Sequence, residues 1–242
     1  MNAIEIKNLT KQYSDILAVD NLNLSIKEGE LFSLLGVNGA GKTTTIKMLS
    51  CLTQPTNGNA FLLGNSILNN KAEVTSIIAV SPQETAIAPM LTVRENLDLI
   101  CGIYSFSKNK QTEKIKELTK LLHLESVMNR KAGKLSGGWQ RRLSIAMALI
   151  SEPKILFLDE PTLGLDVIAR SELWDIIRSL KGKVTIILTT HYMEEAEALS
   201  DRIGIMKNGK LLICDTPDAI KITTNENSIE KAFIKIIRGI EQ

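Results

Sequence analysis

The chain has 242 residues and a formal net charge of +2, from 29 basic and 27 acidic side chains. This balance disfavours a nucleic-acid-binding protein, because a surface that binds DNA or RNA usually carries a strong basic excess. With 44% hydrophobic residues, the chain has enough apolar side chains for one large α/β domain, or for a core with an inserted subdomain.

The first eighty residues predict a β-rich region around one short helix. Apolar alternation predicts strands at residues 3–9 and 17–26. A short apolar run predicts a strand at residues 31–35 that is buried on both faces. A helix is then expected at residues 44–52, and further strands at residues 58–63 and 76–80.

From residue 92 the pattern becomes helical. Apolar spacing predicts helices at residues 92–104, 112–122 and 138–150 with few strand signals between them, which is typical of a helical insertion in an α/β core. The alternation then resumes, with strands at 154–158 and 184–189, helices at 167–180 and 193–199, a hairpin of 202–206 with 210–214, and two short helices after 216. Such alternation predicts a mostly parallel sheet with ligands at the carboxyl ends of its strands.

Three cysteines, Cys51, Cys101 and Cys214, lie far apart and form no C-x-x-C pair, which disfavours a disulfide framework or a zinc site and fits a reducing compartment. The N-terminus has no long apolar stretch behind a basic head, so we expect no signal peptide. No apolar run approaches the roughly 18 to 20 residues that span a bilayer. We therefore expect a cytoplasmic protein that needs another polypeptide to move any solute across a membrane.

One segment matches the phosphate-binding pattern G-x-x-x-x-G-K-[ST], namely Gly36-Val37-Asn38-Gly39-Ala40-Gly41-Lys42-Thr43. Glycines let the backbone bring several N–H groups to phosphates, and the following helix N-terminus adds its positive dipole end. Lys42 offers a charge to the β- and γ-phosphates, the Thr43 hydroxyl can ligate Mg²⁺, and Thr44 completes the predicted nucleotide-binding set. A chance glycine-rich turn is disfavoured by the flanking strand and helix.

Two carboxylates, Asp159 and Glu160, follow the apolar strand at residues 154–158. Asp159 is placed to hold the metal, directly or through water, and Glu160 to orient or deprotonate an attacking water. Alone, such a pair is more typical of a solvated turn or a helix cap. Together with a phosphate loop, it favours a catalytic interpretation.

The segment Leu135-Ser136-Gly137-Gly138 precedes a strong amphipathic helix. Ser136 suits the N-cap position, and the glycines leave the first-turn N–H groups free. The local residues leave two interpretations open: a capped helix, or an anion site at a helix N-terminus.

Four segments in this order, GVNGAGKT, LSGGWQRR, LFLDEPTLGLD and TTHYMEEAE, resemble the ATP-binding subunits of ABC transporters. The resemblance covers residues 4–218, and LSGG is specific to that superfamily among P-loop proteins. It implies a P-loop α/β core with a mostly parallel sheet, an N-terminal antiparallel β region and an inserted helical subdomain. The implied division is a core at residues 1–83 and 152–222, a helical subdomain at 84–151 and a helical tail at 223–242.

The resemblance also implies an ATPase that works as a head-to-tail dimer, with itself or with a homologous cassette. The Ser136-Gly137-Gly138 of one subunit would cap the γ-phosphate bound on Lys42 of the other, so that two ATP molecules are sandwiched. Closure would drive a separate membrane permease from the cytoplasmic face of the cell membrane. Asp166 resembles the residue that lines the dimer seam, and its local alternative is a cap for the next helix.

Three further roles rest on the same resemblance. Gln83 would touch Mg²⁺ and the attacking water, His191 would sense the γ-phosphate, and Tyr13 would stack on adenine. Their local alternatives are a surface loop residue, a structural strand-end histidine and an ordinary half-buried tyrosine. With only two histidines in the chain, a His-based metal cluster is excluded.

Two positions depart from the common family pattern: Trp139 stands where many members have Gln, and Val37 where Pro is common. The sequences of the last two segments most resemble those of bacterial export-type subunits for drugs, sodium or polymers. The competing functions are a soluble ABC ATPase that remodels a cytosolic complex and a non-hydrolysing nucleotide sensor. A P-loop kinase is disfavoured because it has no use for LSGG.

Overall fold

The larger of two sheets is mostly parallel, as the strand–helix alternation predicts. The computed structural model, which describes residues 1–239, places six strands in the order β10-β9-β3-β8-β7-β6. The strands are β3 (Leu31–Gly36), β6 (Ile78–Ser81), β7 (Ile155–Asp159), β8 (Thr185–Thr190), β9 (Arg202–Lys207) and β10 (Lys210–Asp215). All neighbours run parallel except β9 and β10, which are antiparallel. Every residue of β3, β7 and β8 is buried, as expected of strands covered on both faces.

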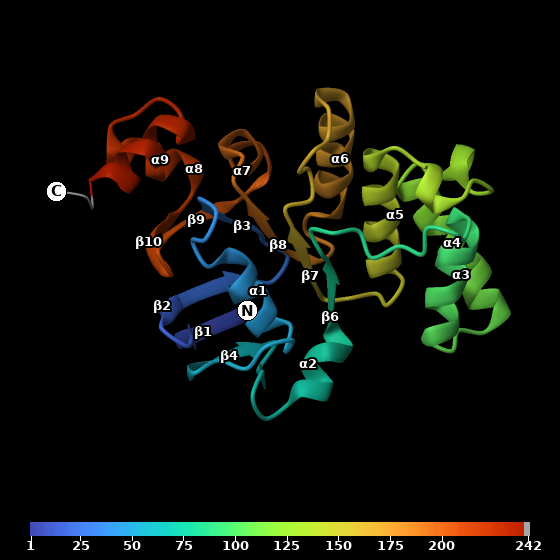
Figure 1. Ribbon diagram of the computed structural model, residues 1–242, viewed down its shortest axis with the longest axis horizontal. Helices are drawn as coiled ribbons and strands as arrows, with labels where there is room; N and C mark the ends of the chain where they lie inside the picture. The colour runs from blue at the N-terminus through green and yellow to red at the C-terminus, as the bar shows by residue number, and fades with distance from the viewer. Residues whose placement is uncertain (240–242) are drawn as a thin grey trace.

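A second, antiparallel sheet confirms the predicted N-terminal β region. Its order is β2-β1-β4-β5, and its strands are β1 (Asn2–Tyr13), β2 (Ile16–Lys27), β4 (Asn57–Leu62) and β5 (Asn65–Ser66). Helix α1 (Lys42–Leu49) packs between the two sheets (Figure 1). One buried cluster joins Ile4 and Val19 of the small sheet, Ile46 of α1 and Phe157 of the large sheet.

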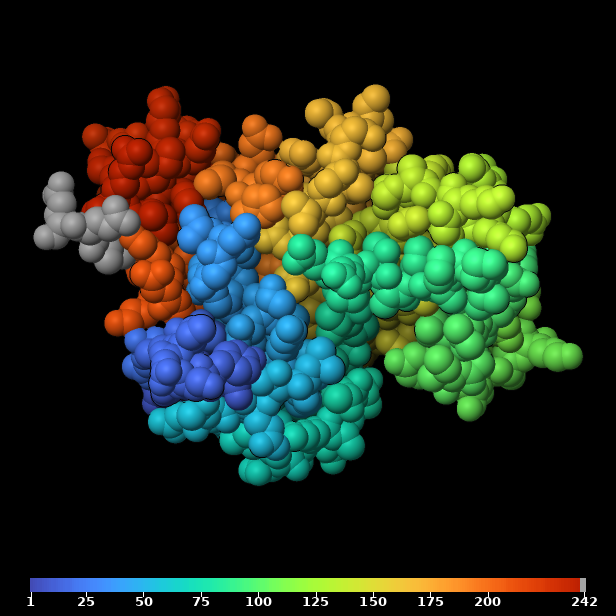
Figure 2. Space-filling view, viewed as in Figure 1, coloured from blue at the N-terminus to red at the C-terminus, as the bar shows by residue number. Residues whose placement is uncertain are grey.

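Three helices make a lobe at one end of the molecule, shown in green and yellow-green in Figure 2. They are α3 (Val93–Ile103), α4 (Lys108–Leu121) and α5 (Gly137–Leu149), with short 3-10 turns at Glu125–Val127 and Ala132–Lys134. Helix α3 begins with a reciprocal cap, in which Thr92 and Glu95 each accept a hydrogen bond from the other's backbone N–H. Leu97 and Leu143 of the lobe share one buried cluster with Leu156 and Leu188 of the sheet, so the lobe is anchored to the core.

The remaining helices are α2 (Lys71–Ile77), α6 (Val167–Leu180), α7 (Met193–Leu199), α8 (Pro217–Thr224) and α9 (Ile229–Arg238). The last two confirm the two short helices predicted after residue 216. Of the tail predicted at residues 223–242, residues 240–242 lie outside the described residues. Between residues 1 and 239, none of the helices is long and apolar enough to cross a bilayer. The division of the chain into domains stays a prediction.

Two predicted elements were wrong in part. Residues 76–77 end helix α2 and do not begin the strand predicted at 76–80. Only Val74 of this helix is buried, so the sequence shows no apolar stripe. The helix predicted at 44–52 runs from Lys42 to Leu49, because Cys51 takes a left-handed backbone with φ 61°. The predicted hairpin between β9 and β10 is confirmed, with positive φ at both Asn208 and Gly209.

Candidate active site

The loop between β3 and α1 has, at two positions, a backbone conformation that residues with a side chain rarely adopt. Gly39 and Gly41 have φ of +80° and +103°. A Cβ on Gly41 would also lie 2.4 Å from the carbonyl oxygen of Ala18, so this loop packs directly against β2.

A cavity of about 660 Å³ opens beside the loop. It is lined by Tyr13, Ile16, Leu17, Ala18, Asn38, Gly39, Ala40, Gly41, Lys42, Thr43, Thr44, Gln83, Glu160 and Asn208. The fold therefore brings most of the predicted nucleotide-binding residues to one place. A cavity of this size, with glycine-rich backbone and one ammonium group in its wall, fits a nucleotide phosphate chain.

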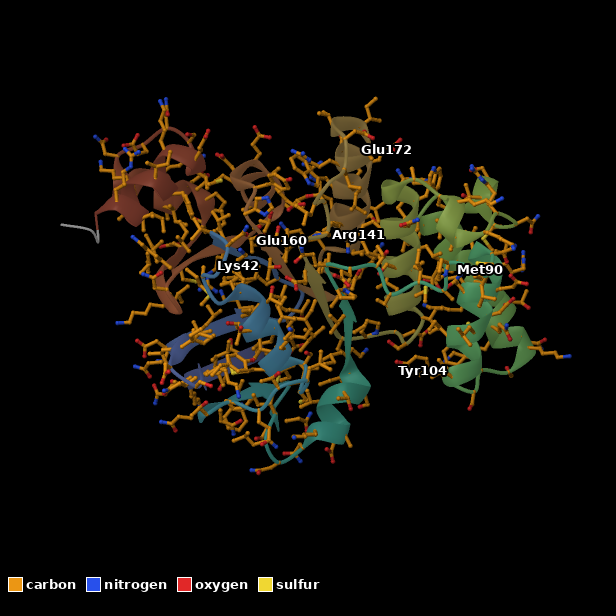
Figure 3. All side chains as sticks on the ribbon, viewed as in Figure 1. Lys42, Met90, Tyr104, Arg141, Glu160 and Glu172 are labelled. Carbon is orange, nitrogen blue, oxygen red and sulfur yellow. The ribbon has the colours of Figure 1, made fainter. Side chains whose placement is uncertain are left out.

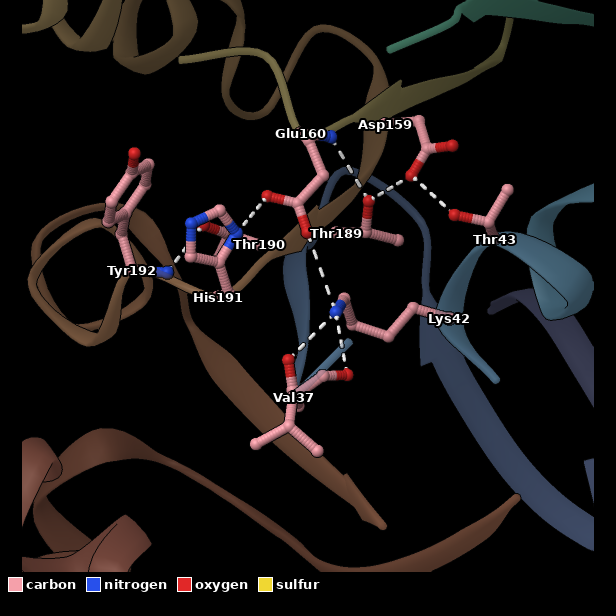
Figure 4. A network of polar contacts seen from close by, with 10 residues as sticks. Val37, Lys42, Thr43, Asp159, Glu160, Thr189, Thr190, His191 and Tyr192 are labelled. Atoms are coloured by element: carbon pink, nitrogen blue, oxygen red, sulfur yellow. Dashed lines mark hydrogen bonds and ion pairs between the residues drawn. The ribbon is translucent and has the colours of Figure 1, made fainter. Parts of the chain in front are cut away.

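Lys42 points back into the loop that precedes it (Figure 4). Its Nζ donates hydrogen bonds to the carbonyl oxygens of Gly36 at 2.7 Å and Val37 at 3.3 Å. The same atom lies 3.4 Å from Glu160 Oε1, and only 6% of the Lys42 side chain is exposed. The ammonium group is thus held at the cavity wall by two carbonyl dipoles and one carboxylate.

Glu160 receives contacts from both sides. His191 Nδ1 lies 2.6 Å from its Oε2, opposite the oxygen that faces Lys42 (Figure 4). Glu160 has a left-handed backbone with φ 50°, which is costly for a residue with a side chain. Its N–H donates to both the carbonyl oxygen and Oγ1 of Thr189 at 3.1 Å, and these bonds hold the strained residue in place.

Asp159 is buried and accepts two hydroxyl hydrogen bonds at Oδ1. Thr189 donates at 2.5 Å and Thr43 at 3.3 Å. The residues that the structure describes contain no group of three or more His, Cys, Asp or Glu side chains able to hold a metal. Thr43 and Gln83 line the cavity, whereas Asp159 does not and is linked to it through its hydrogen bond with Thr43. These three side chains offer oxygen donors, which suits Mg²⁺ that keeps waters and phosphate oxygens as its other ligands.

Gln83 is exposed, and its loop is tied to helix α5 by Arg141. The Arg141 Nη atoms donate to the carbonyl oxygens of Pro82 and Gln83, both at 2.6 Å. Arg141 is 4% exposed, and burial lowers the pKa of its guanidinium, while the negative charge of Asp159 opposes that shift. In the view of Figure 3, Arg141 is labelled between Glu160 and the helical lobe.

The LSGG segment does not line this cavity. It lies beside the turn that carries Asp166: a Cβ on Gly138 would lie 3.1 Å from Ala169 Cβ. Ser136 stands at the N-cap of α5 and is exposed, yet its side chain makes no capping hydrogen bond within residues 1–239. Asp166 does cap α6, because its Oδ1 accepts from the Ala169 N–H at 2.9 Å. The helix-cap interpretation of Asp166 is therefore confirmed.

Tyr13 stands at the end of β1, is 43% exposed and lines the cavity. The Lys11 ammonium lies 4.8 Å from its ring centroid. Ile16 and Leu17 add exposed apolar surface next to it, which is the surface a flat heteroaromatic ring favours. The stacking of Tyr13 on adenine stays a prediction.

Three residues of the site were missed by the sequence analysis. Thr189 and Arg141 lie inside the quoted segments TTHYMEEAE and LSGGWQRR, but their partners are distant in sequence. Asn208, in the β9–β10 turn, lines the cavity from the far end of the chain. A polar residue inside a buried strand, as Thr189 is in β8, was the one available signal.

A family model described as "ABC transporter" matches residues 19–163. The chain belongs to the ABC transporter family. It is 40% identical over 97% of its length to the "probable multidrug ABC transporter ATP-binding protein YbhF" of Escherichia coli (strain K12), of which it spans only 41%. It is also 42% identical over 90% of its length to the "Nod factor export ATP-binding protein I" of Burkholderia orbicola (strain AU 1054), and spans 72% of that protein.

Solved structures of ABC cassettes share the fold. The dimeric ATP-binding cassette MJ0796, described in a post-hydrolysis state with ADP and Pi, superposes with a TM-score of 0.78 and 31% identity. The match covers 88% of this chain and 98% of that cassette. The family and its cassettes indicate an ATPase, and they confirm the predicted fold and ATP binding.

Proposed function

We propose that this chain is the ATP-hydrolysing subunit of an ABC exporter, and that it closes as a dimer around two ATP molecules to drive a separate membrane permease. The observation that carries the proposal is the Glu160 carboxylate, held between Lys42 and His191 at the wall of the phosphate-loop cavity. Such a carboxylate is placed to act on a water beside a bound phosphate.

The phosphate loop would bind the nucleotide. The loop at residues 36–41 and the N-terminus of α1 would present backbone N–H groups to the phosphates, and Lys42 would add its positive charge. Tyr13 would stack on the base. Thr43, Asp159 and Gln83 would hold Mg²⁺, which when bound supplies positive charge against the phosphate oxygens.

Glu160 would orient the attacking water and accept its proton. His191 Nδ1 lies 2.6 Å from Glu160 Oε2, which limits how that carboxylate can rotate. His191 would also contact a γ-phosphate; this is supported by its position after the carboxyl end of β8, which is next to β7 in the sheet. Catalysis would then come from positioning and electrostatics.

A second cassette would complete the site. Ser136, Gly137 and Gly138 lie away from the cavity of their own chain, and Ser136 is exposed with a hydroxyl that caps no helix within residues 1–239. Asp166 stands on the neighbouring turn and would line the same seam. The dimer of the MJ0796 cassette supports this arrangement.

Export is supported by the names of the relatives, a probable multidrug transporter protein and a Nod factor export protein. We place the chain on the cytoplasmic face of the membrane through its permease. We also propose residues 84–151 as the helical subdomain and residues 1–83 with 152–222 as the nucleotide-binding core.

Two measurements test the proposal. A Glu160→Gln variant with Mg-ATP should form a dimer by light scattering, and adding Gly137→Asp should leave it monomeric with ATP still bound. A Cβ on Gly137 meets only Leu165 Cδ2, at an ordinary 3.5 Å, so that variant should fold. Purification from native membranes should recover a multi-span protein. Recovery of soluble partners alone would favour the remodelling ATPase.

A further inference from the structure

Two side-chain contacts join helix α6 to helix α7 and to Tyr192, the N-cap residue of α7. Trp174 Nε1 of α6 donates to Glu195 Oε1 of α7 at 3.1 Å. One turn earlier on α6, the Arg170 guanidinium carbon lies 4.6 Å from the centroid of the Tyr192 ring. Residues four apart lie on one face of a helix, so both contacts are made from the same side of α6.

Each of these two helices begins just after a proposed site residue. Asp166 is the N-cap of α6, and His191 stands two residues before the start of α7. The His191 and Tyr192 rings lie 4.2 Å apart, and the Tyr192 N–H donates to Thr190 Oγ1 at 2.9 Å. A shift of α7 against α6 would therefore move His191 relative to Glu160.

Glu195 is an unexpected residue at this position. It is 0% exposed, and burial raises the pKa of its carboxyl, which favours the neutral acid. A buried polar side chain costs free energy that an apolar residue of similar size would not. What a carboxyl adds to this packing is a directional acceptor for the Trp174 indole N–H.

We propose that Glu195 is a positioning residue: through its hydrogen bond with Trp174 it fixes α7 against α6, so that His191 stays in contact with Glu160. The same contact links the Asp166 turn, at the proposed dimer seam, to the His191 loop. Glu195 itself does not line the phosphate-loop cavity. The inference rests on the roles proposed above for Glu160 and His191.

Two variants at one position separate the hydrogen bond from packing. Glu195→Leu removes the acceptor, and we expect kcat for ATP hydrolysis to fall about tenfold with KM for ATP within about twofold, because the phosphate loop is untouched. Glu195→Gln keeps an acceptor oxygen, and kcat should stay within about twofold. Glu194→Leu, at the exposed neighbouring position, is the matched control and should behave as wild type.

Trp174→Phe removes the donor and keeps the aromatic packing, so it tests the contact from the other side. If both losses act through one hydrogen bond, the Glu195→Leu, Trp174→Phe double variant should be no slower than the slower single variant. If Glu195→Leu does not fold, Trp174→Phe alone tests the same hydrogen bond.

The chain has only two tryptophans, so the NMR signals of their indole N–H groups can report directly on the Trp174 hydrogen bond. Trp139→Phe assigns the signal of Trp174. That signal should be protected from hydrogen exchange in wild type and in Glu195→Gln, and lose protection in Glu195→Leu.

Three outcomes would overturn the inference. In the first, Glu195→Leu loses the protection of Trp174 yet keeps kcat within twofold of wild type. In the second, Glu195→Gln is as slow as Glu195→Leu, which would assign the effect to charge. In the third, KM rises while kcat is kept. Failure of the proposed function would appear separately, as normal hydrolysis by a His191→Ala or Glu160→Gln variant.

Discussion

Lys42 Nζ and Glu160 Oε1 lie 3.4 Å apart, with only 6% and 7% of the two side chains exposed. Lys42 begins α1 after β3, and Glu160 follows β7; β8 alone separates these two strands in the sheet. Little water reaches the pair to screen it. Under the proposed function, a γ-phosphate bound at Lys42 would compete with Glu160 for one ammonium group and would so free the carboxylate to act on a water.

Replacing Glu160 by Gln should stop turnover without stopping binding. The amide cannot accept a proton from water, so we expect the rate of phosphate release to fall at least about a hundredfold. The dissociation constant for ATP should stay within a few-fold. Glu125→Gln, exposed in a 3-10 turn of the helical lobe, is the control. A Glu160→Gln rate above half of wild type would remove Glu160 from its role.

Replacing Lys42 by Ala should weaken nucleotide binding itself. Hydrogen bonds to charged groups contribute about 1.5–3 kcal/mol, so the dissociation constant for Mg-ATP should rise at least about tenfold by calorimetric titration. Lys47→Ala, exposed in the last turn of the same helix, should leave that constant unchanged. Equal affinities for the two variants would contradict the assignment of Lys42.

Replacing Arg141 by Lys should loosen the Gln83 loop. One ammonium group cannot reproduce two guanidinium hydrogen bonds to neighbouring carbonyl oxygens, and burial makes the loss costly. We expect the free energy of unfolding in urea to fall by about 1–3 kcal/mol, with a lower rate of hydrolysis. Arg178→Lys, at an exposed ion pair on α6, should cost under about 0.5 kcal/mol.

Glu195 should make the stability of the protein depend on pH. Burial raises the pKa of its carboxyl above the ordinary 4.5, so the folded chain holds this proton more tightly than the unfolded chain. Its contribution to the free energy of unfolding is then complete below pH 4.5 and is lost as the pH rises toward the folded pKa.

A Glu195→Gln variant does not titrate at this position. Its free energy of unfolding minus that of wild type should grow with pH, by at most about 1.4 kcal/mol per pH unit, until the folded pKa is passed. Urea unfolding from about pH 5 to pH 8 measures this difference. Glu194→Gln should give a flat difference, and a flat line for Glu195→Gln as well would contradict burial of a neutral acid.

Much of the fold follows from local pattern. Residues 167–180 and 193–199 were predicted as helices with the bounds that the structure has, because their apolar spacing matches one buried face. Helix α2 escaped prediction because Val74 is its one buried residue. The phosphate loop could be predicted because a contiguous segment carries its backbone requirement and its charge.

The sequence by itself determined which chemical groups this protein has, since the phosphate loop, the strand-end carboxylates and the LSGG turn are each local. Only the tertiary structure decided which of them meet. Strand order sets Glu160 between Lys42 and His191, and Arg141 reaches the Gln83 loop across separate elements. The left-handed backbone at Glu160 is held by Thr189 of the neighbouring strand. The physical reason is that such contacts depend on long-range packing, which no short window of residues encodes.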